Sequence, residues 1–88
     1  MNYYVYLIGS RKNNLLKTYV GYTINLKNRL KKHNTNAGAK STRGRLWKIF
    51  YFKIYKSKKK AMSEEYKLKK NKIRRKRIIA RYLSTNRV

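Results

Sequence analysis

The chain has 88 residues, of which 26 are Lys or Arg and only 2 are Asp or Glu, so its formal net charge is +24. Hydrophobic residues make up 41% of it, which is too much for a disordered basic tail and too little for a membrane protein. The sequence has no Cys and 1 His. Disulfides, thiol nucleophiles, Cys/His zinc sites and metal sites built from several carboxylates are therefore excluded. We expect a single domain, 1–88, in an intracellular protein whose compartment is not resolved.

Two strands are expected first. Aromatic and β-branched residues alternate over 2–8, which predicts a strand buried on both faces. The polar run that follows predicts a turn over 9–14, and 18–23 predicts a second strand that pairs with the first in an antiparallel hairpin. Gly21 lies inside that second strand, where a glycine usually marks a bulge or a close approach by another group.

A helix is expected next, with Thr23 or Asn25 as its N-cap. The polar segment 34–45 contains two glycines and predicts a loop, and the aromatic alternation of 46–55 predicts a third strand. Two further helices are expected, one beginning near Lys59 and one that follows a break at Asn71. The predicted order β-β-α-β-α-α describes an α+β domain with a small three-stranded antiparallel sheet flanked by helices.

The segment 72–88 combines an apolar stripe with many arginines. The stripe consists of Ile78, Ile79, Tyr82 and Leu83, and the flanking arginines are Arg74, Arg77 and Arg81. Two interpretations are open: a basic amphipathic helix whose arginines follow a nucleic-acid backbone, or a simple packing helix with solvated arginines.

The two acidic residues are adjacent in the first of these C-terminal helices. Helical periodicity places Glu65 inside an apolar arc that includes Met62, and it places Glu64 on the solvent side. A carboxylate that faces inward requires a cation or a metal ion. Spacing alone leaves Glu65 either in an ion pair, with Lys69 or Lys72, or as a metal ligand.

Other candidates carry weaker signals by themselves. Arg29 and His33 are i,i+4 neighbours at the edge of an apolar stripe, but a lone His at a helix end is typical of a cap or a surface residue. Runs such as 58–60 and 74–77 are usually solvated faces, although the overall charge excess favours contacts with phosphates. Three aromatic residues could stack on bases if they are exposed: Tyr22, Trp47 and Tyr51.

In chain order, these residues together resemble the paired signature of the GIY-YIG nuclease superfamily. The two halves are Val5-Tyr6-Leu7 and Tyr19-Val20-Gly21, and the first half has Val where many members have Gly, as in the small bacterial single-domain members. The resemblance continues through Arg29, His33, the motif Thr42-Arg43-Gly44-Arg45 and Glu65, over about residues 3 to 80. The family fold is a three-stranded antiparallel sheet flanked by helices, and members such as excinucleases, homing endonucleases and junction-resolving nucleases cut DNA.

The resemblance implies a metal-dependent endonuclease that hydrolyses phosphodiester bonds in DNA. Whether it selects its substrate by DNA structure stays open. The resemblance implies that Tyr6 and Tyr19 lie near the scissile phosphate and that Arg29 neutralises charge on the phosphoryl oxygens. It also implies that His33 assists proton transfer and that Glu65 holds one divalent cation, Mg²⁺ or Mn²⁺. Whether Tyr6 or His33 takes the proton of the attacking water stays open.

A second function is also open, that of a non-catalytic nucleic-acid-binding protein that retains the fold, such as an RNA-binding component of a ribonucleoprotein. The large positive charge favours this alternative. With either function the expected partner is nucleic acid, DNA more than RNA, with no membrane and with a protein partner as an option for targeting. The side chains expected to contact nucleic acid are Lys40, Arg43, Arg45, Arg74, Arg77 and Arg81.

Overall fold

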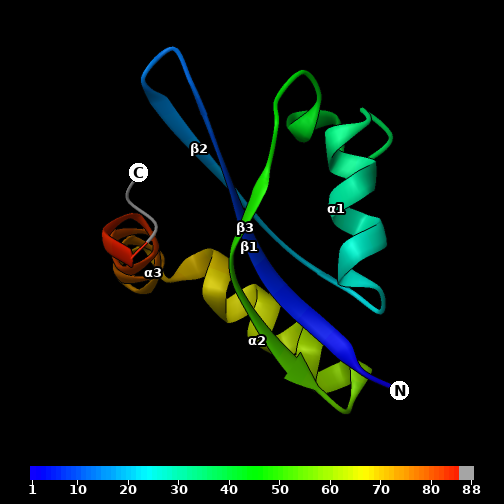
Figure 1. Cartoon of the computed structure of the whole chain (residues 1–88). Helices are drawn as coiled ribbons and strands as arrows, with labels where there is room; N and C mark the ends of the chain where they lie inside the picture. Colours follow the sequence, from blue (N-terminus) through cyan, green and yellow to red (C-terminus); the bar gives the residue numbers. More distant parts are fainter. Residues whose placement is uncertain (86–88) are drawn as a thin grey trace.

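The computed structural model describes residues 1–85 and has a three-stranded antiparallel sheet at its centre, in the order β2-β1-β3 (Figure 1). The strands are β1 (Tyr3–Lys12), β2 (Leu15–Thr23) and β3 (Lys48–Tyr55). The helices are α1 (Leu26–Asn34), the 3₁₀ turn η1 (Lys40–Thr42), α2 (Lys58–Lys70) and α3 (Lys72–Thr85). The predicted α+β class and element order are confirmed. No helix in the described part of the chain is long and apolar enough to cross a membrane.

The first hairpin is longer than the sequence pattern predicts. Because β1 runs to Lys12 and β2 begins at Leu15, the turn expected over 9–14 shrinks to Asn13 and Asn14. Both asparagines have positive φ values, 54° and 64°, which is the left-handed conformation that tight hairpin turns require and that Asn tolerates. The end of the hairpin extends beyond the core, so its polar residues lack the hydrophobic alternation that identifies a strand. The third strand is shorter than predicted and begins at Lys48.

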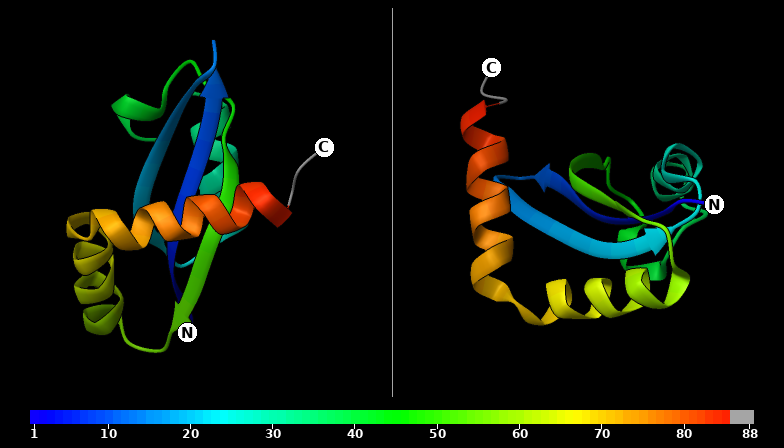
Figure 2. Two further views of the ribbon diagram at one scale, coloured as in Figure 1. Left: turned by 90° about the vertical axis from the view of Figure 1, so that its left-hand side faces the viewer. Right: turned by 90° about the horizontal axis from the view of Figure 1, so that it is seen from below.

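The sheet separates two small cores, with α1 on one face and α2 on the other (Figure 2, right). Tyr6 and Ile8 face α1 and pack with the buried Trp47. On the other face, β1 presents Val5 and Leu7 to residues of α2 and α3. The predicted strand with burial on both faces is therefore confirmed.

Asparagine side chains start two of the helices. The Asn25 side chain accepts a hydrogen bond from the Asn28 N–H at 3.0 Å, so Asn25 is the N-cap of α1. The Thr23 hydroxyl oxygen in turn accepts a hydrogen bond from the Asn25 N–H. The break expected at Asn71 is confirmed: its side chain accepts from the Arg74 N–H at 3.0 Å, and α3 turns away from α2 to form an L (Figure 2). Side-chain caps of this kind satisfy backbone donors that the first helical turn leaves free.

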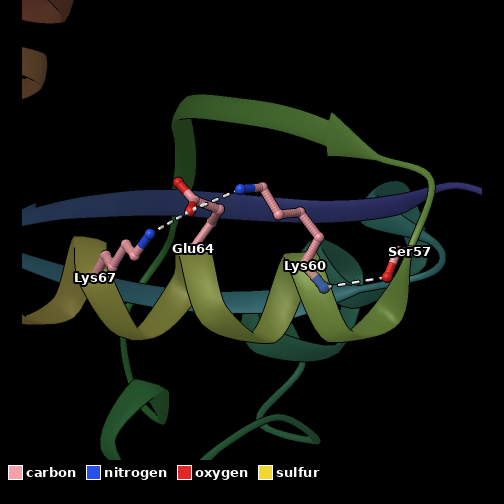
Figure 3. Close-up of polar contacts among 4 residues, drawn as sticks. All are labelled: Ser57, Lys60, Glu64 and Lys67. Atoms are coloured by element: carbon pink, nitrogen blue, oxygen red, sulfur yellow. Dashed lines mark hydrogen bonds and ion pairs between the residues drawn. The ribbon is translucent and has the colours of Figure 1, made fainter.

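The buried face of α2 differs from the predicted one. Ala61 and Leu68 are buried on this helix, and Glu64 and Glu65 lie on the two sides of that buried line, each with a side chain 17% exposed. Met62 and Tyr66, which helical periodicity places on the predicted inward arc of this helix, are instead 48% and 61% exposed, and Ile73, which lies on α3 beyond the break at Asn71, is 68% exposed. The prediction that Glu64 faces solvent is therefore wrong. Its carboxylate extends from α2 toward the sheet, with Lys60 and Lys67 at 3.6 and 3.1 Å (Figure 3).

The last helix, α3, packs through three residues of the predicted apolar stripe, whereas the fourth, Leu83, is exposed. Ile78 and Ile79 contact the core on the α2 face of the sheet. Tyr82 stacks on Phe50 of β3, with ring centroids 4.0 Å apart and an interplanar angle of 13°. The last three positions of the predicted basic helix, 86–88, lie outside the described residues.

Candidate active site

The candidate site is centred on a buried contact between strand β1 and helix α1. The Tyr6 Oη lies 3.0 Å from His33 Nε2, and both side chains are enclosed. Tyr6 is paired in register with Gly21 on the edge strand β2, and a Cβ atom at that glycine would stand 2.5 Å from the Tyr6 Oη. Only a glycine lets the phenol cross β2 to reach α1. The close approach that a mid-strand glycine predicts is thus confirmed.

The far side of the His33 ring is enclosed by the loop that follows α1. His33 Nδ1 lies 2.9 Å from the Thr42 Oγ1, and the Thr42 hydroxyl donates to the Ala39 carbonyl at 2.7 Å. Gly38 lies against the ring, since a Cβ there would meet Nδ1 at 2.6 Å. His33 is fully buried, so the interpretation of this residue as a helix cap or a surface residue is wrong.

Tyr19 and Arg29 complete the surroundings of this pair, and both are half-buried. The Tyr19 ring lies 5.2 Å from the His33 ring and 6.5 Å from the Tyr6 ring. Burial and then Tyr19 raise the pKa of Tyr6 above its ordinary value, while Arg29 acts in the opposite direction. Burial and then the charge of Arg29 lower the pKa of His33. Near neutral pH, both members of the pair are therefore uncharged.

The two glutamates of α2 act on different tyrosines. After burial and Tyr19, the negative charge of Glu65 also contributes to the raised pKa of Tyr6. Glu64 instead contributes to the raised pKa of Tyr55, at the end of β3, after the larger effect of burial. Glu65 also forms an ion pair with Lys69 at 3.3 Å. This is the ion pair that the sequence leaves open as an alternative to a metal-ligand role.

The donor set limits the metal site that these residues could form. Among residues 1–85 there is no group of three or more His, Cys, Asp or Glu that could hold a metal ion. Glu65 is the carboxylate whose charge acts on Tyr6. A single carboxylate suits Mg²⁺ where waters and phosphate oxygens of a bound substrate complete its octahedral shell. The donor set among residues 1–85 therefore fits a cation that Glu65 shares with a bound substrate.

The six basic residues expected at a nucleic-acid interface fall into two groups. Two are engaged within the fold: the Arg45 Nη2 donates to the carbonyls of Ser10 and Leu15 at 3.0 and 3.2 Å, and the Arg74 Nη2 donates to the Tyr51 Oη at 3.0 Å. The other four are exposed: Lys40, Arg43, Arg77 and Arg81. Nucleic-acid contact stays a prediction for all six.

The three aromatic residues considered for base stacking make contacts within the fold. Trp47 is buried, and its Nε1 donates to the Thr42 carbonyl at 2.8 Å, so it cannot stack on a base. Tyr51 accepts the hydrogen bond from Arg74, and Tyr22 is half-buried against the core.

Sequence reasoning assigned no role to several residues that shape the site. Thr42 and Gly38 contact His33 directly, and Asn34 holds the loop through two hydrogen bonds to the Trp47 backbone, at 2.6 and 3.1 Å. These residues lie in or beside a polar loop without periodicity. The only signal for them was the resemblance to the nuclease superfamily, which takes in the loop from Asn34 to Lys40 and the motif that begins at Thr42.

Comparison with known protein families gives a match over most of the chain. The model of the GIY-YIG catalytic domain matches residues 2–78. The chain belongs to the GIY-YIG family. The matched range includes Tyr6, Tyr19, Arg29, His33 and Glu65 but ends inside α3, before Arg81 and Tyr82.

Similar family members are found among bacterial proteins. The UPF0213 protein OB0043 of Oceanobacillus iheyensis is 46% identical over 68 residues, which cover 76% of each chain. The UPF0213 protein CPE1444 of Clostridium perfringens is 44% identical over 76% of this chain and 70% of its own. The solution NMR structure of the UPF0213 protein BH0048 from Bacillus halodurans is 38% identical, with a TM-score of 0.49, over 91% of this chain and 83% of that one. None of these names states an activity.

Proposed function

We propose that this GIY-YIG protein is a metal-dependent endonuclease that hydrolyses phosphodiester bonds in DNA. The observation that carries the proposal is the buried Tyr6–His33 hydrogen bond beside Tyr19 and Arg29. Phosphodiester hydrolysis needs a group that removes a proton from water and a cation that offsets charge on the phosphoryl oxygens. These four residues supply both functions on the face of the sheet that α1 covers.

The proton route that the electrostatics favour runs through Tyr6 to His33. Tyr6 retains its own proton at neutral pH because its pKa is raised, so it is not a base by itself. His33 is neutral and can accept a proton. As the water oxygen bonds to phosphorus, its proton passes to the Tyr6 Oη while the phenolic proton passes to His33 Nε2. The bond between phosphorus and the ester oxygen then breaks, and that oxygen leaves with the bonding electron pair and takes a proton from solvent water.

Charge stabilisation is assigned to Arg29 and Glu65. Arg29 offsets the negative charge that develops on the phosphoryl oxygens. Glu65 would hold one Mg²⁺ or Mn²⁺ ion together with the substrate, and when bound that ion stabilises charge on the transferring phosphoryl group. For Glu65 to do so, its contact with Lys69 must give way to the ion.

One observation favours the second candidate function, nucleic-acid binding without catalysis. Tyr6 is 1% and His33 0% exposed, so the pair could also serve as a satisfied polar contact within the core. In that case, the exposed Lys and Arg side chains of a chain with a charge of +24 would do the binding.

A cleavage assay with two matched variants separates the two functions. The protein is incubated with branched, single-stranded and double-stranded DNA and RNA, in Mg²⁺, Mn²⁺ or EDTA. Glu65→Gln and Glu64→Gln each remove one negative charge from a side chain that is 17% exposed. We expect Glu65→Gln to abolish metal-dependent cleavage while binding is kept or tightened, and Glu64→Gln to cut like the parent. If both variants cut like the parent, the role of Glu65 is wrong. If the parent cuts no substrate, the binding function replaces the nuclease.

A further inference from the structure

We infer that Thr42 is a positioning residue that holds His33 in the single tautomer able to accept a proton from Tyr6. The inference rests on the proposed function and concerns the same site. It depends on a chain of three hydrogen bonds, two buried and the last part-buried, that runs from Tyr6 through His33 and Thr42 to the carbonyl of Ala39.

Counting hydrogens fixes the direction of each bond in this chain. A threonine hydroxyl has one hydrogen, and a carbonyl oxygen can only accept. Since the Thr42 Oγ1 lies 2.7 Å from the Ala39 carbonyl, its hydrogen is used there. The same oxygen can then only accept from His33 Nδ1, at 2.9 Å, so Nδ1 carries the hydrogen of the neutral ring. Nε2 is left bare and accepts the hydrogen of the Tyr6 hydroxyl at 3.0 Å.

The surroundings prevent Thr42 from adopting another role. The residue is fully buried, its own N–H donates to the Ala39 carbonyl at 3.0 Å, and its carbonyl accepts from the Trp47 Nε1 at 2.8 Å. Gly38 lies directly against Nδ1 of the imidazole. The hydroxyl is thus fixed on both sides, and a buried Nδ1–H that lost it would be left without a partner, which is costly.

This arrangement suits the proton transfer proposed for the site. In the other tautomer, Nε2 would carry the hydrogen and donate it to the Tyr6 oxygen, and no proton could move from Tyr6 to His33. When Nε2 gains the phenolic proton, both ring nitrogens are donors, and Thr42 still accepts from Nδ1. The hydroxyl therefore serves both protonation states without reorganisation.

The tautomer can be measured directly because His33 is the one histidine of the sequence. Two-bond and three-bond ¹⁵N–¹H correlation spectra of the untagged protein at neutral pH distinguish Nδ1–H from Nε2–H. We expect the parent to be in the Nδ1–H form. Thr42→Val keeps the shape of the side chain but removes the acceptor, and should shift His33 toward Nε2–H. Thr42→Ser keeps the hydroxyl and should retain the parent pattern.

Kinetics link the tautomer to the reaction. Thr42→Val should lower kcat by about 10- to 100-fold with little change in KM, and Thr42→Ser should restore most of it. A parent in the Nε2–H form, or a folded Thr42→Val protein that keeps Nδ1–H and the parent kcat, overturns the inference. Because the parent spectrum alone can overturn it, the test does not depend on Thr42→Val being folded. If the parent shows Nδ1–H and cuts nothing, the positioning of His33 stands and the proposed nuclease function fails.

Discussion

At Gly21 the backbone of β2 lies directly against the Tyr6 side chain of the candidate site. A Cβ there would stand 2.5 Å from the Tyr6 Oη and 2.7 Å from the ring carbon that carries it. Gly21→Ala should therefore displace the phenol from His33, lower the free energy of unfolding by about 1–3 kcal/mol and abolish cleavage. Urea denaturation and the cleavage assay measure the two effects.

A second variant tests whether this cost comes from the phenol. Tyr6→Phe removes the nearest atom, so Gly21→Ala should cost measurably less stability in the Tyr6→Phe background than in the parent. Equal costs in the two backgrounds would contradict the proposed clash.

His33 should make stability depend on pH in a defined direction. Burial, and then Arg29, lowers the pKa of His33 in the folded protein, while in the unfolded chain the ring titrates near ~6.5. Below about pH 6.5 the unfolded chain therefore binds more protons, and the free energy of unfolding falls as the pH falls toward the folded pKa. Above that range this contribution is constant. Urea denaturation between about pH 5 and 8 should show the decline, and His33→Gln should remove it. The same decline in His33→Gln would assign the effect to another group.

Among the structural elements, α3 carries arginines of two kinds. Arg77 and Arg81 are exposed, whereas Arg74 donates to the Tyr51 hydroxyl. If α3 follows a nucleic-acid backbone, replacing both Arg77 and Arg81 by Gln should reduce the slope of log K against log salt by about 2 and leave thermal stability unchanged. Arg74→Gln should instead lower the free energy of unfolding by about 1 kcal/mol. Unchanged affinity in the double variant would identify α3 as a packing helix.

The sequence predicted which helices and strands form better than it predicted where they begin and end and which of their faces are buried. Alternation in the buried part of β1 was clear because both faces of the strand are covered, but the outer hairpin, ending at Asn13 and Asn14, lies beyond the core and shows no such pattern. On α2, hydrophobicity misplaced the buried face because Met62 and Tyr66 are apolar yet exposed. Glu65 was nevertheless expected to face inward, since it borders both the predicted and the observed face.

For the candidate site, the sequence indicated the main residues but not the contacts that hold them in place. The resemblance grouped Tyr6, Tyr19, Arg29 and His33, and the structure brings them together. The contact of Thr42 could not be read from the sequence, because the partner of a polar loop residue depends on the path of the loop rather than on a repeat.

At the scale of the whole molecule, positive charge covers every element. Exposed Lys or Arg side chains lie on all three strands and on all three α-helices of the described chain. We expect tight binding to nucleic acid with little sequence preference, and a plot of log K against log salt with a slope steeper than about −3. Fluorescence anisotropy with labelled duplexes of unrelated sequence measures both. A shallower slope would show that few phosphates are engaged.

The long-range hydrogen bonds of the site have a consequence for ligand linkage. The Tyr6–His33 and His33–Thr42 bonds join residues 27 and 9 positions apart and are lost on unfolding, whereas the charge of +24 remains. A polyanion should therefore bind the unfolded chain as well. A ligand raises the melting temperature only by its preference for the folded over the unfolded state. The increase in melting temperature that DNA produces should thus be smaller than the value calculated from the dissociation constant of DNA and the folded protein. This increase measures only how much more tightly DNA binds the folded chain than the unfolded chain.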